Sequence, residues 1–189
     1  STGSLQSGDE AVSGAIIPGL PNLHSHAFQR ACAGLTEHRH SDSPGSQDSF
    51  WTWREVLHSF VTRLGPDDQG AIACQLYLEM LKSGYTAVGE FHYLHKDPSG
   101  AAYADPAEMS RRLIIAAEQI GIGMTLLPVL YSVGGYRGVE INAGQRRYVL
   151  EVEKFIDQVS TLEGIATGNP SLRIGIAPHS VRQVPAEQM

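Results

Sequence analysis

Strand-like and helix-like segments alternate along nearly the whole chain, and this alternation limits the architectures that it can adopt. Apolar runs of strand length occur at 15–23, 85–92, 123–131 and 172–178. Around them, apolar residues recur at helical spacing over 49–64, 66–83, 106–120 and 145–162. Strands that are apolar on both faces and alternate with helices predict a parallel sheet covered by helices, which is either a doubly wound sheet or a (β/α) barrel.

The positions of the polar residues favour the barrel, because a barrel gathers its chemistry at the carboxyl ends of its strands. Polar residues lie at or just after the end of each predicted strand: His24, His26, Glu90, His92, Tyr93, Ser132 and His179. No Gly-x-Gly-x-x-Gly sequence follows the first strand, so the dinucleotide-binding form of the doubly wound sheet lacks its signature. We therefore expect residues 15–189 to form the N-terminal half, about four βα units, of an α/β TIM barrel. The small polar residues of 1–14 predict a linker or tag-like segment.

Charge and cysteine content narrow the class of partner. Acidic residues outnumber basic ones by 20 to 14, with a formal net charge of −6, so no basic face predicts binding to nucleic acid or to an anionic membrane. No apolar run has the length of a membrane span, and the N-terminus has no signal-peptide pattern. Cys32 and Cys74 form no Cys-x-x-Cys pair, which favours a reducing compartment. We expect a cytoplasmic protein that binds a small molecule.

The most informative motif is His24-Ser25-His26, which ends the first predicted strand. Side chains two residues apart on a strand point to the same side, so both imidazoles could bind one ion through neutral ring nitrogens. Such ligands suit zinc. A pair of hydrogen-bonded structural histidines is the alternative. The apolar run before the pair, and the polar Gln29 and Arg30 after it, favour the metal site.

A second group of candidates lies further along the chain. Arg182 follows His179 after the fourth predicted strand, where its guanidinium could bind a carboxylate, although His179 could equally be a capping or core imidazole. Arg54 lies beside two tryptophans, which favours a pocket over the solvated position usual for a helix arginine. Tyr93 could donate a hydrogen bond into the barrel mouth, while Glu90 is expected to support the site or to form a structural ion pair.

The remaining histidines are expected to have no role. They lie on predicted loops or helix surfaces, where most exposed histidines are solvated. These are His38, His40, His58 and His95.

Four segments closely resemble the motifs of formimidoylglutamate deiminases, a family of the amidohydrolase superfamily. They are PGLPNLHSHAFQR at 18–30, FWTWRE at 50–55, GYTAVGEFHYLH at 84–95 and APHSVR at 177–182. The resemblance extends from about residue 14 to the end of the chain. These motifs are far more specific than a His-x-His pair, which many amidohydrolases share.

The resemblance implies both a reaction and residue roles. The reaction is hydrolysis of N-formimidoyl-L-glutamate to N-formyl-L-glutamate and ammonia, in histidine degradation, by a water that a zinc ion activates. A substrate with two carboxylates accounts for arginines in the site, and our hypothesis is that Arg54 and Arg182 bind them. The implied zinc ligands are His24 and His26, and the implied substrate contacts are Gln29, Arg54, Tyr93, His179 and Arg182.

The chain departs from the family pattern in its length. It stops soon after the fourth predicted strand, before the strands that carry the family's other metal ligands and its acid–base carboxylate. Two imidazoles alone make a weak zinc site, so we expect these 189 residues alone to have little or no activity. Half a barrel also exposes the edges of its outer strands, which favours pairing with the missing half or with another copy, most simply as a homodimer.

Two other functions remain open from the sequence. Another amidohydrolase deaminase, acting on guanine, cytosine or a triazine, would share the histidine pair and the barrel, although planar heterocycles call for stacking and amide contacts rather than arginines. A non-catalytic half-barrel that only binds a partner chain or a metal would be consistent with the short chain.

Overall fold

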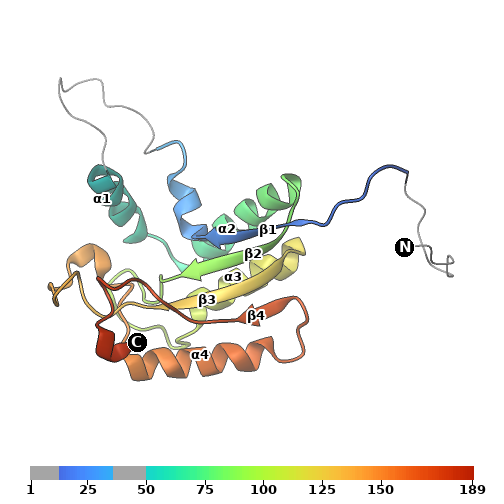
Figure 1. The fold of residues 1–189 in the computed structure, drawn as a ribbon. Coiled ribbons are helices and arrows are strands. Elements are labelled where there is room, and N and C mark those ends of the chain that lie inside the picture. The colour runs from blue at the N-terminus through green and yellow to red at the C-terminus, as the bar shows by residue number, and fades with distance from the viewer. Residues whose placement is uncertain (1–12, 36–49) are drawn as a thin grey trace, which may run out of the picture.

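The computed structural model describes residues 13–35 and 50–189, and its strands form one parallel sheet. In order across the sheet these are β1 (Leu20–Ser25), β2 (Tyr85–His92), β3 (Gly123–Leu130) and β4 (Leu172–Ile174). A two-residue strand, β5 (Ala177–Pro178), follows β4 and also pairs with β3. Because all the strands run in one direction, their carboxyl ends meet at one edge of the sheet (Figure 1).

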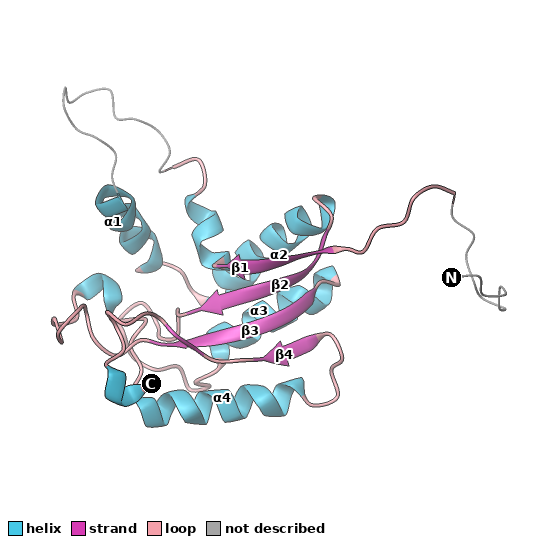
Figure 2. Cartoon of the chain, viewed as in Figure 1, coloured by secondary structure: helices cyan, strands magenta, loops and turns pink. Residues whose placement is uncertain are grey.

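Helices connect these strands. They are α1 (Phe50–Val61), α2 (Pro66–Lys82), α3 (Glu108–Ile120) and α4 (Val152–Ala166). Three short 3-10 turns are η1 (Ala27–Cys32), η2 (Ala143–Gln145) and η3 (Ala186–Gln188). Helices α2 and α3 lie behind the sheet in Figure 2, while α4 runs beside β4. No helix in the described parts of the chain is long and apolar enough to cross a membrane.

The main core lies between the sheet and helices α2 and α3. Val88 of β2 and Leu126 of β3 belong to one buried cluster with Tyr77 of α2 and Leu113 of α3. Side chains alternate between the faces of a strand, so the same side of β2 also buries Glu90. The strand periodicity thus places a carboxyl group in this largely apolar layer.

The helix ends follow from local sequence signals. Pro66 occupies the first turn of α2, and the carboxylate of Asp68 accepts a hydrogen bond from the Gly65 amide at 2.8 Å. Gly121 ends α3 in the left-handed region, with φ of 81°, and its amide bonds to the Ala117 carbonyl. Both helix ends lie within a residue of those expected from the sequence.

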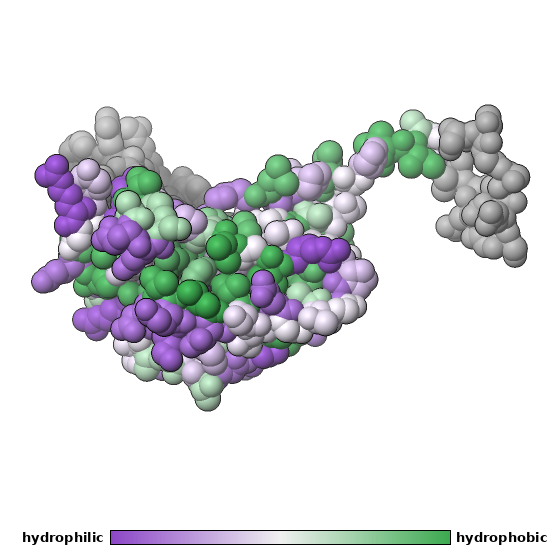
Figure 3. Space-filling view, turned by 60° about the horizontal axis from the view of Figure 1, so that its bottom comes forward, coloured by the Kyte–Doolittle hydropathy of each residue, from purple (hydrophilic) through white to green (hydrophobic). Residues whose placement is uncertain are grey.

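Two expected strand boundaries are wrong, because pairing partners set them. The first strand begins at Leu20 rather than at residue 15, since its neighbour β2 begins at Tyr85 and residues 15–19 precede any partner strand. These residues form an extended arm with exposed apolar side chains (Figure 3). The strand expected over 172–178 is split into β4 and β5, opposite the stretch of β3 that contains Pro128, which has no N–H to donate.

The helix expected over 145–162 begins at Val152 instead. Gln145 belongs to η2, where its buried amide donates hydrogen bonds to the Tyr131 hydroxyl at 2.6 Å and to the Gly134 carbonyl at 2.9 Å. Ile156, an apolar residue of the predicted helix, is 56% exposed. The segment 1–14, expected to be linker or tag-like, lies mostly outside the described residues.

The expectation that His95 is exposed is also wrong. Its side chain is only 3% exposed, and its Nε2 lies 2.9 Å from the Val129 carbonyl oxygen, so the ring joins the segment after β2 to β3. The Gln158 amide of α4 lies 3.4 Å from Nδ1. Burial lowers the pKa of His95 to about 4, although the bond to Val129 opposes this shift.

We therefore expect the protein to lose stability in mild acid. Between pH 6.5 and about 4 the unfolded chain protonates His95 while the folded chain does not, so the free energy of unfolding falls as the pH decreases through this window. The full shift corresponds to about 3 kcal/mol. Urea denaturation at pH 7 and 4.5 measures the loss. In His95→Gln, which keeps a donor for Val129, the loss should be smaller, and an unchanged loss would contradict the assignment.

Candidate functional site

His24 and His26 lie together at the carboxyl end of β1. Their ring centroids are 4.6 Å apart and the ring planes are nearly perpendicular, at 83°. His26 Nδ1 lies 2.8 Å from the carbonyl oxygen of Phe91 on β2. If Nδ1 carries the proton and donates it to this carbonyl, Nε2 keeps a free lone pair, which is the usual arrangement of a histidine that binds a metal.

The donor set at this edge fits a zinc-type ion. Burial lowers the pKa of His26, the Phe91 carbonyl opposes that shift, and His24 adds to it, so the net shift favours the neutral ring that a metal ligand must be. Within residues 13–35 and 50–189, no cluster of three or more His, Cys, Asp or Glu side chains completes a metal site. The described residues therefore provide two imidazole ligands, and further ligands would have to come from elsewhere.

Tyr93 and His179 lie beside the histidine pair. The centroid of the Tyr93 ring is 5.3 Å from that of His26 and 5.3 Å from that of His179. The Gln29 amide donates a hydrogen bond of 2.7 Å to the Tyr93 hydroxyl. The ends of β1, β2 and β5 thus bring together the histidine pair, Tyr93 and His179, and Gln29 of η1 is bonded to Tyr93.

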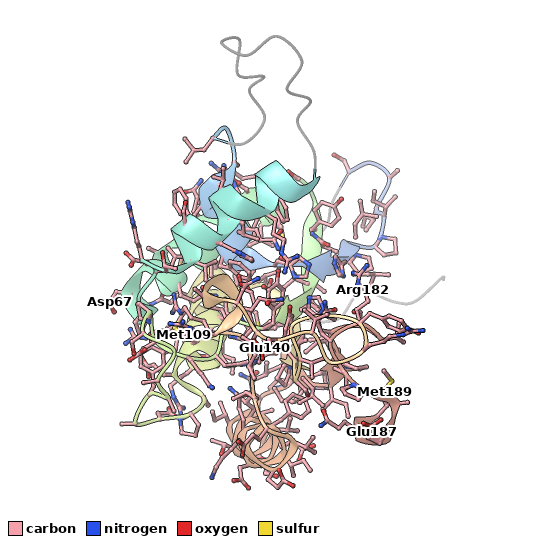
Figure 4. The ribbon with its side chains drawn as sticks, turned by 90° about the vertical axis from the view of Figure 1, so that its left-hand side faces the viewer. Asp67, Met109, Glu140, Arg182, Glu187 and Met189 are labelled. Carbon is pink, nitrogen blue, oxygen red and sulfur yellow. The ribbon has the colours of Figure 1, made fainter. Side chains whose placement is uncertain are left out.

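A pocket of about 520 Å³ opens next to these residues. Arg54 of α1 and Arg182, which follows β5, both line it, together with Tyr93 and His179. Figure 4 shows this edge of the sheet, with Arg182 labelled. His24, His26 and Gln29 are not part of its wall. The other lining residues are Trp53, Leu57, His58, Tyr131, Gly134, Gly135, Tyr148 and Gln183.

The pocket is lined by cationic side chains. Two guanidinium groups line it, and none of its described lining residues is acidic. Burial lowers the pKa of His179 to about 4, a hydrogen bond to Gln183 opposes this, and His26 and both arginines lower it further. At pH 7 His179 is therefore a neutral imidazole, whose Nδ1 lies 3.1 Å from Gln183 Oε1. Such a pocket suits an anionic ligand.

His58 was wrongly expected to lie outside any site. It lines the pocket one helical turn after Arg54, and burial followed by the charge of Arg54 lowers its pKa. Gly144 of η2 packs against the ring, since a Cβ there would come within 2.2 Å of His58 Nδ1. The i, i+4 spacing from Arg54 was the available sequence signal.

Two tyrosines of the pocket were also missed. The centroid of the Tyr148 ring lies 5.0 Å from that of Tyr93, and the centroid of Tyr131 lies 4.7 Å from that of His179. They form an aromatic wall against the predicted residues. No motif in the sequence distinguishes them from core tyrosines.

Glu90 forms no ion pair within the described residues. It is fully buried, and its Oε1 accepts a hydrogen bond from the Ala27 amide at 2.6 Å. Burial raises the pKa of Glu90 to about 7, and the bond to Ala27 partly opposes this. The structural ion pair considered for Glu90 is therefore wrong. Its contact with the turn after His26 agrees with the other reading, a residue that supports the site.

Comparisons with known proteins fit this geometry. No protein-family model matches the chain. The chain is 50% identical over 96% of its length to formimidoylglutamate deiminase from Pseudomonas aeruginosa, and it covers 39% of that protein. Among solved structures, an amidohydrolase from Brucella melitensis has a TM-score of 0.83 and 44% identity, over 90% of this chain and 37% of that one.

A more distant structure shows similarity of fold alone. An atrazine chlorohydrolase from Arthrobacter aurescens, complexed with zinc and atraton, has a TM-score of 0.66 at 20% identity, over 90% of this chain and 36% of that one. The chain thus spans less than two-fifths of the length of these relatives. The predicted resemblance to formimidoylglutamate deiminases and the predicted fold, part of an amidohydrolase-type TIM barrel, are confirmed.

Proposed function

We propose that this chain is part of a zinc-dependent deiminase of the cytoplasm that hydrolyses N-formimidoyl-L-glutamate to N-formyl-L-glutamate and ammonia during histidine degradation. The observation that carries the proposal is the position of a pocket, lined by Arg54 and Arg182, next to a pair of imidazoles. Similarity to formimidoylglutamate deiminase supports the choice of substrate. A linear dicarboxylate suits two arginines better than a planar heterocycle does.

Under this proposal, each residue of the candidate site has a role in the reaction. His24 and His26 would hold the zinc ion, and the ion would supply a nucleophilic water at neutral pH. Arg54 and Arg182 would bind the two carboxylates and so orient the formimino group. Burial raises the pKa of the Tyr93 hydroxyl, so the group stays protonated, and Gln29 fixes its position. Tyr93 can therefore donate a hydrogen bond to the substrate.

Ammonia release by the intact protein tests the proposal. N-Formimidoyl-L-glutamate should be hydrolysed with a kcat/KM of about 10⁴ M⁻¹s⁻¹ or more, and guanine, cytosine and a chlorotriazine should not be hydrolysed. Preference for a heterocycle would favour another deaminase of the same superfamily. Binding of zinc and glutamate derivatives without turnover would favour a non-catalytic role. We expect the 189-residue chain alone to be inactive, because two imidazoles are fewer ligands than a catalytic zinc site uses.

We also propose that copies of the protein associate as a homodimer. Leu23 on β1 and Ile176 beside β4 are 79% and 65% exposed, on the two outer sides of the sheet. Exposed strand edges with apolar side chains favour pairing with another chain. Light scattering of the purified protein should give the mass of two copies, and a monomer mass would contradict the proposal.

A further inference from the structure

The carboxyl group of Glu90 lies on the side of β2 that faces the helices, away from the pocket. It is fully buried, and Ser25 and the core residue Tyr77 lie beside it. Burying a carboxyl group is unfavourable unless its hydrogen bonds compensate for the lost water. Its one hydrogen bond of good geometry within the described residues comes from the Ala27 amide, at 2.6 Å. The buried carboxyl group therefore accepts the Ala27 N–H, with the hydroxyl groups of Ser25 and Tyr77 as its polar neighbours.

That N–H belongs to the turn that directs His26. β1 ends at Ser25, which stands opposite Glu90 in the register of β1 and β2, and η1 begins at Ala27. His26 lies between them, with φ of −131° and ψ of 85°, and its own side chain does not cap the turn. The direction of the His26 side chain thus depends on where the Ala27 amide is held.

The next residue of β2 holds the ring itself. The Phe91 carbonyl lies 2.8 Å from His26 Nδ1, while Glu90, one residue earlier, holds the backbone that follows His26. Two consecutive residues of β2 therefore restrain both the main chain and the imidazole of one histidine. A ligand restrained in this way needs less ordering when an ion binds.

We propose that Glu90 is a positioning residue for metal binding, which acts on His26 through the backbone of Ala27. As far as the metal is concerned, the inference rests on the proposed function. Loss of a residue that orients a metal ligand typically lowers metal affinity by about 10- to 100-fold. A residue that merely stabilises the fold would leave the metal affinity of the folded protein unchanged.

The test uses the zinc affinity of the intact protein, measured by competition with a chromophoric chelator. Glu90→Leu removes the acceptor at similar volume and should weaken zinc binding by about 10- to 100-fold. Glu90→Gln keeps an oxygen for the Ala27 amide and should stay within about fivefold of the unsubstituted protein. If Glu90→Leu does not fold, Glu90→Asp replaces it, since the shorter carboxylate keeps the charge but draws the acceptor back from Ala27.

Two control variants separate positioning from stability. Tyr77→Phe removes a hydroxyl beside Glu90 without touching the bond to Ala27, and should keep full zinc affinity. Leu162→Ala opens the core at α4, which lies beside β4 at the opposite edge of the sheet from β1 (Figure 1). This variant should have a lower melting temperature but an unchanged zinc affinity. If the folded Leu or Asp variant of Glu90 binds zinc as tightly as these controls, the proposal is overturned.

A metal-free readout keeps this inference distinct from the proposed function. Long-range ¹H–¹⁵N NMR should show His26 of the zinc-free protein in the single tautomer with the proton on Nδ1. Glu90→Leu should give a mixture of tautomers, and retention of the single tautomer would overturn the inference. If the unsubstituted protein neither binds zinc nor hydrolyses N-formimidoyl-L-glutamate, the proposed function fails, and the tautomer still decides whether Glu90 positions His26.

Discussion

Replacing His24 and His26 together with alanine should remove the zinc ion and lower the deiminase activity of the intact protein by about 10³-fold or more. A catalytic metal contributes several kcal/mol to stabilisation of the transition state, and each 1.4 kcal/mol corresponds to a tenfold change in rate. The fold should survive, because His24 is exposed and His26 is only half-buried. The measurement is kcat/KM for N-formimidoyl-L-glutamate, with the zinc content of the same preparation.

Metal removal from the unsubstituted protein provides the matched control. Treatment with a chelator should abolish its activity, and added zinc should restore it. The double alanine variant should stay inactive after zinc is added, because it lacks the two imidazoles that would bind the ion. A variant that keeps both zinc and activity would show that the histidine pair is structural, which is the alternative that the sequence left open.

The sequence predicted best those features whose signals are local. Helix α3 ends at Gly121 as expected, since an apolar periodicity and a glycine with positive φ act within one turn. The grouping of His24 and His26 also follows from local geometry, because alternation along a strand places them on one side. Parallel topology then brings Tyr93 and His179 to the same edge.

Features that depend on distant partners could not be predicted in this way. The start of β1 is set by the start of β2, some sixty residues later, and the break between β4 and β5 lies opposite Pro128 on a different strand. His95 lies in a loop, yet its ring is buried against the Val129 carbonyl. Burial of a polar side chain is decided by the packing around it, and one sequence carries little information on that packing.

The site residues also divide into those with a local sequence signal and those that depend on distant partners. Motif resemblance identified Arg54, which α1 contributes to the pocket although helix arginines are usually solvated. It did not identify His58, one turn later, whose position depends on the close approach of Gly144. The role of Glu90 also emerges only from the structure, because its hydrogen bond connects β2 to the turn after β1. Residues that act through others leave the weakest signal in a sequence.

Replacing Arg54 or Arg182 with methionine should lower kcat/KM for N-formimidoyl-L-glutamate by about 100-fold each, because loss of a charge-assisted contact with the bound substrate costs about 1.5–3 kcal/mol. Both side chains line the pocket, Arg54 from α1 and Arg182 after β5. Lysine at either position should cost less, since it keeps the charge but loses the forked geometry. Arg63, exposed near the end of α1, is the control, and its methionine variant should keep full activity.

Substrate analogues show which carboxylate each arginine binds. The α-carboxylate is absent from N-formimidoyl-γ-aminobutyrate, and the γ-carboxylate is neutral in N-formimidoyl-L-glutamine. If an arginine binds one carboxylate, the substrate analogue without that carboxylate has already lost the contact. Replacing the arginine with methionine should then lower kcat/KM for that analogue almost no further. The loss with the other analogue should stay near 100-fold. Equal further losses with both analogues would mean that the arginines act only through the general field of the pocket, and the assignment of carboxylate contacts would be wrong.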